Sequence, residues 1–291
     1  MKRKIAKICH KLEHYLPDSI YLQIFWYKQF HTFLNLKNPR TLNEKLQWLK
    51  LHNRKPEFTM MVDKFEVKKY VANIIGEKYI IPSYGVWENF EDIQFDKLPE
   101  QFVLKCTHDN KSTVICHNKS TFDFDSAKEK LENCLRRNFY WWSREWPYKN
   151  VKPRILAEQF LENSDRTAIV DYKFYCFNGQ PEYFMYSVGE AAHNVRNHKF
   201  NLKLESIDYL FKKNPTIRLD EIDLPDNIDE MIQIVKKMCV GFPHIRIDLY
   251  NIDGKIYFGE MTFYSGAGII NIDSKEYSDY LAGLIDLSKV N

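Results

Sequence analysis

Residues 244–262 read HIRIDLYNIDGKIYFGEMT and say more about this chain than any other segment. Apolar and polar residues alternate with a period of two on both sides of Asp253-Gly254, which predicts a β-hairpin with its turn at that pair. The alternation also sorts the first strand into two faces. One face carries Ile245, Ile247 and Leu249, and the other carries Arg246, Asp248 and Tyr250.

The length of the turn decides which residues of the second strand join Asp248. A two-residue turn pairs Asp248 with residue 259 and turns Glu260 to the opposite face. A three-residue turn, closed by Gly254 as a left-handed bulge, pairs residue 248 with 258 and residue 246 with 260. Only this second register unites the apolar residues on one face, so we predict it. Its apolar face also includes Tyr257 and Met261.

The predicted register gathers four chemically useful side chains on the polar face: Arg246, Asp248, Glu260 and Thr262. Two carboxylates with a cation and a hydroxyl on one sheet face suit Mg²⁺ bound to a polyphosphate. For the hairpin by itself, an ordinary solvated sheet face is the alternative interpretation.

Composition limits the class of protein. The 291 residues suffice for one large or two modest domains with a real core. The net charge of +3, from 42 basic and 39 acidic residues, is too balanced for nucleic acid to be the main partner. Six cysteines are scattered without metal-binding spacing, which predicts reduced thiols in a cytoplasmic protein. No apolar run approaches the length of a membrane span.

The first residues, MKRKIAKICHK, are basic but lack the apolar core of a secretion signal. They could form a basic amphipathic helix on an anionic membrane or polymer, which would place the protein at the inner face of the membrane. A solvated first helix is the alternative.

Periodicity predicts mixed helices and strands without strict alternation, hence the α+β class. Residues 1–62 read as mostly helical, and the capping box of Thr41 and Glu44 marks one helix start. Further helices are predicted at 63–76, 124–142 and 226–240, and strands at 79–87, 102–106, 113–116, 154–161, 168–177 and 182–187.

Two lysines lie inside apolar strands, Lys105 between Leu104 and Cys106, and Lys173 within VDYKFYC. A buried lysine is costly unless an anion meets it. For each lysine considered separately, the alternative is that it lies on an edge strand and protects that strand from aggregation. A nucleoside triphosphate bound with magnesium would explain these two lysines together with Asp248 and Glu260.

The order of these residues resembles the ATP-grasp superfamily. Within it, the chain resembles the TupA-like ATP-grasp family of bacterial surface-polysaccharide gene clusters. The resemblance runs from about residue 38 to the last residue. It is carried by TLNEKLQWLK (41–50), DK (63–64), FVLK (102–105), EQFL (158–161), DYKFYCFNG (171–179), RIDLY (246–250) and YFGEMTF (257–263).

The resemblance implies two lobes with antiparallel sheets that clasp ATP. It divides the chain into a helical segment (1–62), a small lobe (63–157) and a large lobe (158–291). Lys105, Lys64 and Lys173 resemble phosphate or nucleotide contacts. The hinge, whose backbone pairs with adenine, would be Glu158, Gln159, Phe160 and Leu161, with Glu162 near ribose. Asp248, Glu260 and Thr262 resemble magnesium ligands, although many relatives carry asparagine at the last position. Arg246 and Lys173 would be the catalytic cations.

One segment departs from the family pattern. The loop 107–112 resembles the flexible flap over the triphosphate, but it contains no glycine. Ser112 or backbone N–H groups could still meet phosphate, and Lys111 could supply a cation. His108 reads as a loop or substrate-contact histidine rather than a general base.

The aromatic segment 140–148 could stack on a sugar ring, or form a packed helix end.

The resemblance implies an ATP-dependent carboxylate–amine ligase that acts through an acyl phosphate and joins an amino acid to a uronic acid of a surface polysaccharide. A glycosyltransferase is the alternative, since Asp123-Phe-Asp125 offers a D-x-D metal motif, although Asp123 also suits a helix N-cap. A non-catalytic polysaccharide-assembly partner and phosphotransfer to an alcohol also remain open.

Overall fold

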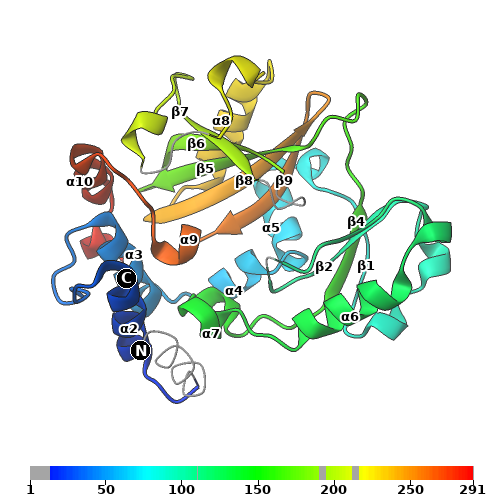
Figure 1. The fold of residues 1–291 in the computed structure, drawn as a ribbon, viewed down its shortest axis with the longest axis horizontal. Coiled ribbons are helices and arrows are strands. Elements are labelled where there is room, and N and C mark those ends of the chain that lie inside the picture. Colours follow the sequence, from blue (N-terminus) through cyan, green and yellow to red (C-terminus); the bar gives the residue numbers. More distant parts are fainter. Residues whose placement is uncertain (1–13, 110, 190–194, 212–215, 291) are drawn as a thin grey trace.

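The computed structural model describes residues 14–109, 111–189, 195–211 and 216–290 (Figure 1). Within them lie two antiparallel sheets and an N-terminal helical region. The helices are α2 (Asp18–Phe30), α3 (Leu42–His52), α4 (Glu57–Val62), α5 (Glu66–Ile75), α6 (Phe124–Leu135), α7 (Tyr140–Ser143), α8 (Ile228–Met238), α9 (Ser265–Gly268) and α10 (Lys275–Leu284). The predicted α+β class is therefore confirmed.

The four-stranded sheet, here sheet A, has the order β1-β4-β2-β3. Its strands are β1 (Ser83–Trp87), β2 (Phe102–Cys106), β3 (Val114–Cys116) and β4 (Ile155–Gln159). Phe102, Leu104 and Cys106 pack with buried residues of α6 on one face. Alternation along β2 sends Lys105 to the other face, where its strand neighbour β4 places Glu158.

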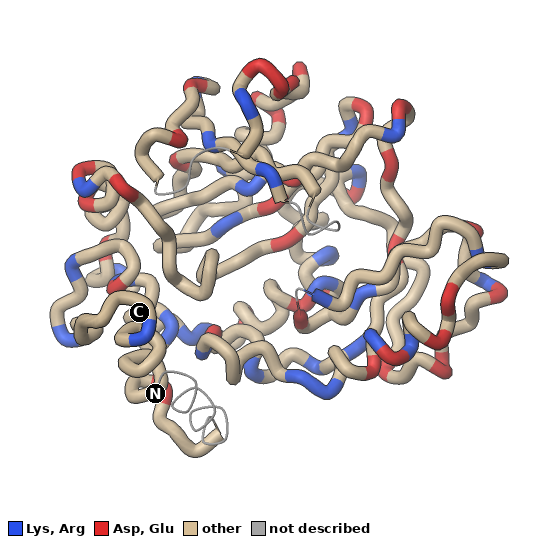
Figure 2. The backbone as a smooth tube through the Cα atoms, in the orientation of Figure 1, with Lys and Arg blue, Asp and Glu red and all other residues tan. Residues whose placement is uncertain are grey.

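The five-stranded sheet, here sheet B, has the order β7-β6-β5-β8-β9. Its strands are β5 (Val170–Phe177), β6 (Gln180–Val188), β7 (Arg196–Asn201), β8 (His244–Ile252) and β9 (Lys255–Thr262). Ile245, Ile247 and Leu249 on one face are fully buried in the large hydrophobic core, together with apolar residues of α8. The other face is polar, and Figure 2 shows charged residues of both signs on these strands.

The register predicted for the β8–β9 hairpin is wrong. The turn has two residues, because Ile252 pairs with Lys255, and both Asp253 (φ 49°) and Gly254 (φ 78°) are left-handed, as a tight hairpin turn requires. A bulge at Gly259 then shifts the pairing, so that Leu249 pairs with Phe258 but Asp248 pairs with Glu260.

Because of this bulge, the predicted polar side chains of β8 and β9 still share one face, although the register differs from the predicted one. It places Glu260 and Thr262 on the face of Asp248 and Arg246, as predicted. Tyr257, however, pairs with Tyr250 and so lies on the polar face rather than the apolar one. Met261 pairs with Ile247 on the apolar face, where Phe258 and Ile256 lie as well.

The other predicted elements are mostly found, with shifted ends. The capping box of Thr41 and Glu44 is present at the start of α3. The helix predicted from residue 63 begins later, because the Asp63 side chain accepts hydrogen bonds from the N–H groups of Phe65 (2.9 Å) and Glu66 (3.1 Å). The predicted helix 124–142 is broken, because Asn138 accepts from the N–H of Tyr140 (3.0 Å) and starts α7.

Some features lie outside the predictions or outside the described residues. The strand β7 and the helix α10 were not predicted from the sequence. The strand β4 runs through Gln159 in sheet A, two residues past the predicted lobe boundary. The basic N-terminal arm lies outside the described residues. In the part of the chain that the structure describes, five cysteines are free and buried, and no helix has the length and apolar character needed to cross a membrane.

The first prediction concerns the bulge. A Cβ atom at Gly259 would lie 3.1 Å from the carbonyl oxygen of Asp248 and 3.1 Å from the Tyr250 ring. Because Asp248 is held in the strand ladder, we expect Gly259→Ala to lower the free energy of unfolding by about 1–3 kcal/mol. Gly283→Ala in α10, where the Cβ meets no atom within 4 Å, is the control and should not destabilise. Equal denaturant midpoints for the two variants would contradict this account.

Candidate nucleotide and metal site

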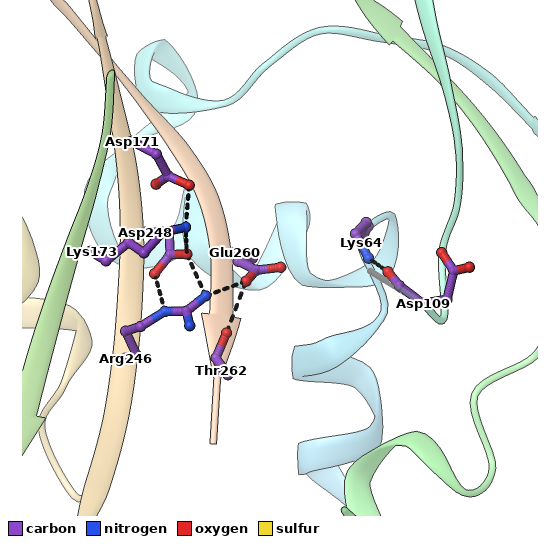
Figure 3. Close-up of polar contacts among 8 residues, drawn as sticks. All are labelled: Lys64, Asp109, Asp171, Lys173, Arg246, Asp248, Glu260 and Thr262. Carbon is purple, nitrogen blue, oxygen red and sulfur yellow. Dashed lines mark hydrogen bonds and ion pairs between the residues drawn. The ribbon is translucent and has the colours of Figure 1, made fainter. Parts of the chain in front are cut away.

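The polar face of sheet B carries a compact ionic cluster centred on Arg246 (Figure 3). Its Nε and Nη2 atoms donate to Oδ1 and Oδ2 of Asp248, both at 2.6 Å. Nη2 also donates to Oε1 of Glu260 at 2.6 Å. Asp248 is 1% exposed, so this two-point contact forms where water does not compete with it.

Three further residues belong to the cluster: Lys173, Asp171 and Thr262. Lys173 on β5 pairs with Asp248 across the strands and lies 3.2 Å from its Oδ2. Lys173 also donates to Asp171 on its own strand. The Thr262 hydroxyl donates to Oε1 of Glu260 at 3.0 Å. The cross-strand pairing of β5, β8 and β9 thus brings together the predicted residues Lys173, Arg246, Asp248, Glu260 and Thr262.

The two carboxylates differ in their protonation behaviour. Burial raises the pKa of Asp248 above its ordinary value, and Arg246 and Lys173 only partly oppose this. Burial also acts to raise the pKa of Glu260, but Arg246, Lys64 and Lys173 outweigh it and lower that pKa to about 2. Glu260 is therefore held as an anion by cations that come from both sides of the site.

A second ionic cluster lies on sheet A, around Glu158. Its Oε2 atom pairs with Lys105 of β2, and its Oε1 atom lies 2.6 Å from Nζ of Lys68 on α5. Glu158 is 3% exposed. Burial acts to raise the pKa of Glu158, but Lys105 and Lys68 outweigh it and hold that pKa below its ordinary value. Lys68 was not predicted as a site residue.

Lys64 connects the two clusters. It precedes α5, and its Nζ donates to the carbonyl oxygen of Asp109 in the loop after β2. Burial lowers the pKa of Lys64, while the charge of Glu260 opposes that shift most strongly. Figure 3 shows the Glu260 side chain between Arg246 and the segment that carries Lys64. Sheets A and B thus bring their charged residues to one place.

The described residues of the loop 107–112 are held by side-chain contacts. The Ser112 hydroxyl donates to Oδ1 of Asp109 (2.5 Å) and accepts from the N–H of Cys106 (2.7 Å). Nε2 of His108 lies 3.0 Å from the carbonyl oxygen of Arg137, after α6. The hydrogen bonds of the Ser112 hydroxyl are therefore made within the loop, and His108 contacts the end of α6. The Lys111 side chain is exposed.

The predicted hinge follows β4. The N–H of Gln159 donates to the carbonyl oxygen of Pro82 at 3.0 Å. Phe160 and Leu161 lie just past the strand end and are partly buried. The Phe160 ring meets the ring of His117 edge-on, with a centroid distance of 4.9 Å. Glu162 is exposed.

The donor atoms suit magnesium that arrives with a phosphate. Among the described residues, no group of three His, Cys, Asp or Glu side chains could hold a metal ion by itself. Asp248 and Glu260 offer hard carboxylate oxygens, with the Thr262 hydroxyl beside Glu260. Mg²⁺ typically takes one or two protein carboxylates and completes its shell with phosphate and water, so this donor set fits.

The aromatic segment supports the packed interpretation. Tyr140 is 2% exposed and its hydroxyl donates to Oδ1 of Asp18 in α2 at 2.5 Å. Nε of Arg144 lies 3.0 Å from the same carboxylate. The segment therefore joins the N-terminal helices to the body of the protein. Trp142, by contrast, has an exposed side chain.

Comparisons with known proteins identify the family. The model of the TupA-like ATP-grasp family matches residues 44–286, so the chain belongs to that family. This membership confirms the predicted family and ATP-grasp fold. Membership also supports the predictions of an ATP-dependent ligase and of ATP as its nucleotide. A search of curated proteins finds no match.

Several solved structures are similar in fold. D-alanine–D-alanine ligase from Helicobacter pylori is 14% identical with a TM-score of 0.45, and the match covers 84% of this chain and 69% of that one. The Bacillus anthracis enzyme complexed with ATP is 17% identical with a TM-score of 0.41, over 79% and 63% of the two chains. The ATP-grasp ligase PsnB with a variant of its minimal precursor, Mg and ADP is 12% identical with a TM-score of 0.44, over 84% and 66%. Likenesses this distant carry no argument about substrates.

The second prediction follows from Glu260. Its pKa is about 2 in the folded protein against 4.5 ordinarily, so its ionised form stabilises the fold above that ordinary value. This contribution is lost as the pH falls from about 4.5 toward 2. Between about pH 5 and pH 3, the free energy of unfolding should therefore fall more steeply in the wild type than in Glu260→Gln.

Urea titrations at several pH values measure this difference. Glu129→Gln, which changes an exposed residue of α6, is the control and should follow the wild type. Parallel pH profiles for the wild type and Glu260→Gln would show that the cations around Glu260 do not hold it ionised.

Proposed function

We propose that this protein is a carboxylate–amine ligase that uses ATP to activate a carboxylate as an acyl phosphate. The observation that supports it most is the opposite charge of the two clusters. Around Glu158 on sheet A, Lys68 and Lys105 outnumber the one carboxylate that they share, and Lys64 lies nearby. On sheet B, the ion pairs among the described residues join three carboxylates to two cations: Asp171, Asp248 and Glu260 with Lys173 and Arg246.

We call these the phosphate side and the metal side. On the phosphate side, Lys105 and Lys64 would contact the triphosphate, with Lys111 and Ser112 of the loop nearby. Backbone groups of residues 158–161 would pair with adenine, and Glu162 would lie near ribose. On the metal side, Asp248, Glu260 and Thr262 would hold Mg²⁺, which neutralises phosphate charge when bound. An excess of cations facing an excess of carboxylates supports this division.

The reaction moves the γ-phosphoryl group of ATP to a carboxylate oxygen and releases ADP. An amine then attacks the acyl carbon, phosphate leaves and the amine nitrogen loses a proton, which leaves an amide. Negative charge spreads over several oxygens during the transfer, and preorganised cations stabilise it. Arg246 and Lys173 are the catalytic cations in this proposal. Their contacts with Asp248 fix their positions before a substrate binds.

The substrates we propose are a uronic acid of a surface polysaccharide, or its precursor, and an amino acid. The resemblance to a family of surface-polysaccharide gene clusters supports this pair. A cytoplasmic enzyme would meet such precursors at the inner face of the membrane. The basic residues at the start of the chain support peripheral contact with that surface.

Two alternatives remain as competing proposals. A glycosyltransferase would need Asp123 and Asp125 as a metal motif, but Asp123 caps α6 by accepting a hydrogen bond from the N–H of Ser126 (2.9 Å). A non-catalytic assembly partner is favoured by the loop 107–112, which lacks glycine and is tied down by Ser112 and His108.

The third prediction tests the reaction. Incubation with ATP, Mg²⁺ and a panel of uronic acids and amino acids should release ADP only with the correct pair. Asp248→Asn should lower this turnover by on the order of 10²–10³ because it removes a charge at the centre of the cluster. Asp123→Asn, which keeps a residue that caps helices equally well, should leave turnover unchanged.

Each other outcome favours a named alternative. Loss of activity in Asp123→Asn, together with thermal stabilisation by nucleotide sugars but not by ATP, would favour the glycosyltransferase. ATP binding without ADP release from any pair would favour the non-catalytic partner.

A further inference from the structure

Lys68 lies on the phosphate side, but its ammonium group makes all of its hydrogen bonds within the protein. Its Nζ lies 2.6 Å from Oε1 of Glu158. It also donates to the carbonyl oxygen of Ile81 at 2.7 Å and to the Ser83 hydroxyl at 2.6 Å. An ammonium group has three donors, so these contacts account for all of them. Lys68 therefore has no donor left for a ligand.

Lys105 is placed differently around the same carboxylate. Glu158 sits on β4 between β1 and β2, where it pairs with Ser83 on one side and Val103 on the other. Its Oε1 faces Lys68 and its Oε2 faces Lys105. Among the described residues, Lys105 makes that one ion pair and keeps the remaining donors of its ammonium group.

We infer that Lys68 is a positioning residue that neutralises Glu158, so that the charge of Lys105 remains available to bind phosphate. The inference rests on the ATP site of the proposed function and adds a residue that does not itself touch the nucleotide. One buried carboxylate cannot neutralise two ammonium groups. The cluster of Lys68, Glu158 and Lys105 therefore keeps one positive charge in excess.

The electrostatics of the cluster support this role. Burial works against the ionised form of Glu158, yet the two lysines keep its pKa below the ordinary value, so Glu158 is an anion. Burial lowers the pKa of Lys68, and the charge of Glu158 is the strongest opposing influence. Without Lys68, the Glu158 carboxylate would neutralise Lys105. A phosphate would then approach an ion pair that has no net charge.

The size of the effect follows from Coulomb attraction. Removal of one unit charge several ångströms from a phosphate, at an effective dielectric constant of about 20, weakens binding by roughly tenfold or more. Adenosine carries no phosphate and should not respond to this change. Lys68 also links α5 to Ile81, before β1, and to Ser83 at the start of β1, so a purely structural role is the competing explanation.

The fourth prediction separates charge from structure. By isothermal titration calorimetry, Lys68→Met should bind ATP with Mg²⁺ about tenfold more weakly than the wild type. Its affinity for adenosine should be unchanged. The double variant Lys68→Met/Glu158→Gln removes one charge of each sign, which restores the excess positive charge, so its ATP affinity should return to within about threefold of the wild type. A lost structural contact would not be restored by removing a second one.

Two further variants complete the test. Ser83→Ala removes one acceptor of Lys68 without changing any charge, and it should bind ATP as the wild type does. Glu158→Gln alone adds one net positive charge beside Lys105, so it should raise the affinity for ATP relative to the affinity for adenosine, which tests the charge argument even if Lys68→Met fails to fold.

Three results decide the matter. Wild-type ATP affinity in Lys68→Met would overturn the inference and leave the proposed function intact. Weak ATP binding by both Lys68→Met and the double variant, with native circular dichroism, would assign Lys68 a structural role. Absence of ATP binding by the wild type would overturn the proposed nucleotide site and this inference together.

Discussion

The site depends on one constraint, which is that a charge buried on the facing sides of the two sheets needs a group of opposite charge beside it. Isolated ions at such burial would be very costly. Arg246 meets this constraint through a two-point contact with Asp248, and Lys173 and Glu260 join from the neighbouring strands. The same requirement explains Glu158 between Lys68 and Lys105 on sheet A. Ion pairs of this kind are rigid, so they also fix the directions in which the unused atoms point.

The bulge at Gly259 is the backbone feature that makes this compensation possible. Without it, the two-residue turn at Asp253-Gly254 would send Glu260 to the apolar face, where it would meet the core around Ile247 and Leu249. The bulge inserts one residue and returns Glu260 to Arg246. A glycine suits the position because a side chain there would press on the backbone of Asp248. Local backbone geometry and site electrostatics are thus satisfied together.

Much of this could be predicted from the sequence, for physical reasons that differ between residues. Period-two alternation predicted that Arg246 and Asp248 share a face, because alternation depends only on the strand itself. The grouping with Glu260 was predicted through the wrong register, since pairing depends on a bulge that a single interior glycine only hints at. Lys68 was missed because its role depends on contacts with Glu158 of β4 and Ser83 of β1, which only the folded chain brings together. For Asp171, the spacing Asp171-x-Lys173 was a usable signal, since residues two apart share a face.

In the proposed function, the opposite charges of the two sides would make binding of the nucleotide and binding of the metal depend on one another. A triphosphate alone would be attracted by the lysines of the phosphate side but repelled by the excess carboxylates around Asp248. A magnesium ion alone would meet carboxylates whose oxygens already accept from Arg246, Lys173 and Thr262. A magnesium–triphosphate complex would satisfy both sides, since Asp248 and Glu260 would hold the ion and the lysines would contact the phosphates. In this proposal the charge distribution would favour the complex over either component, through residues that come from several segments of the chain.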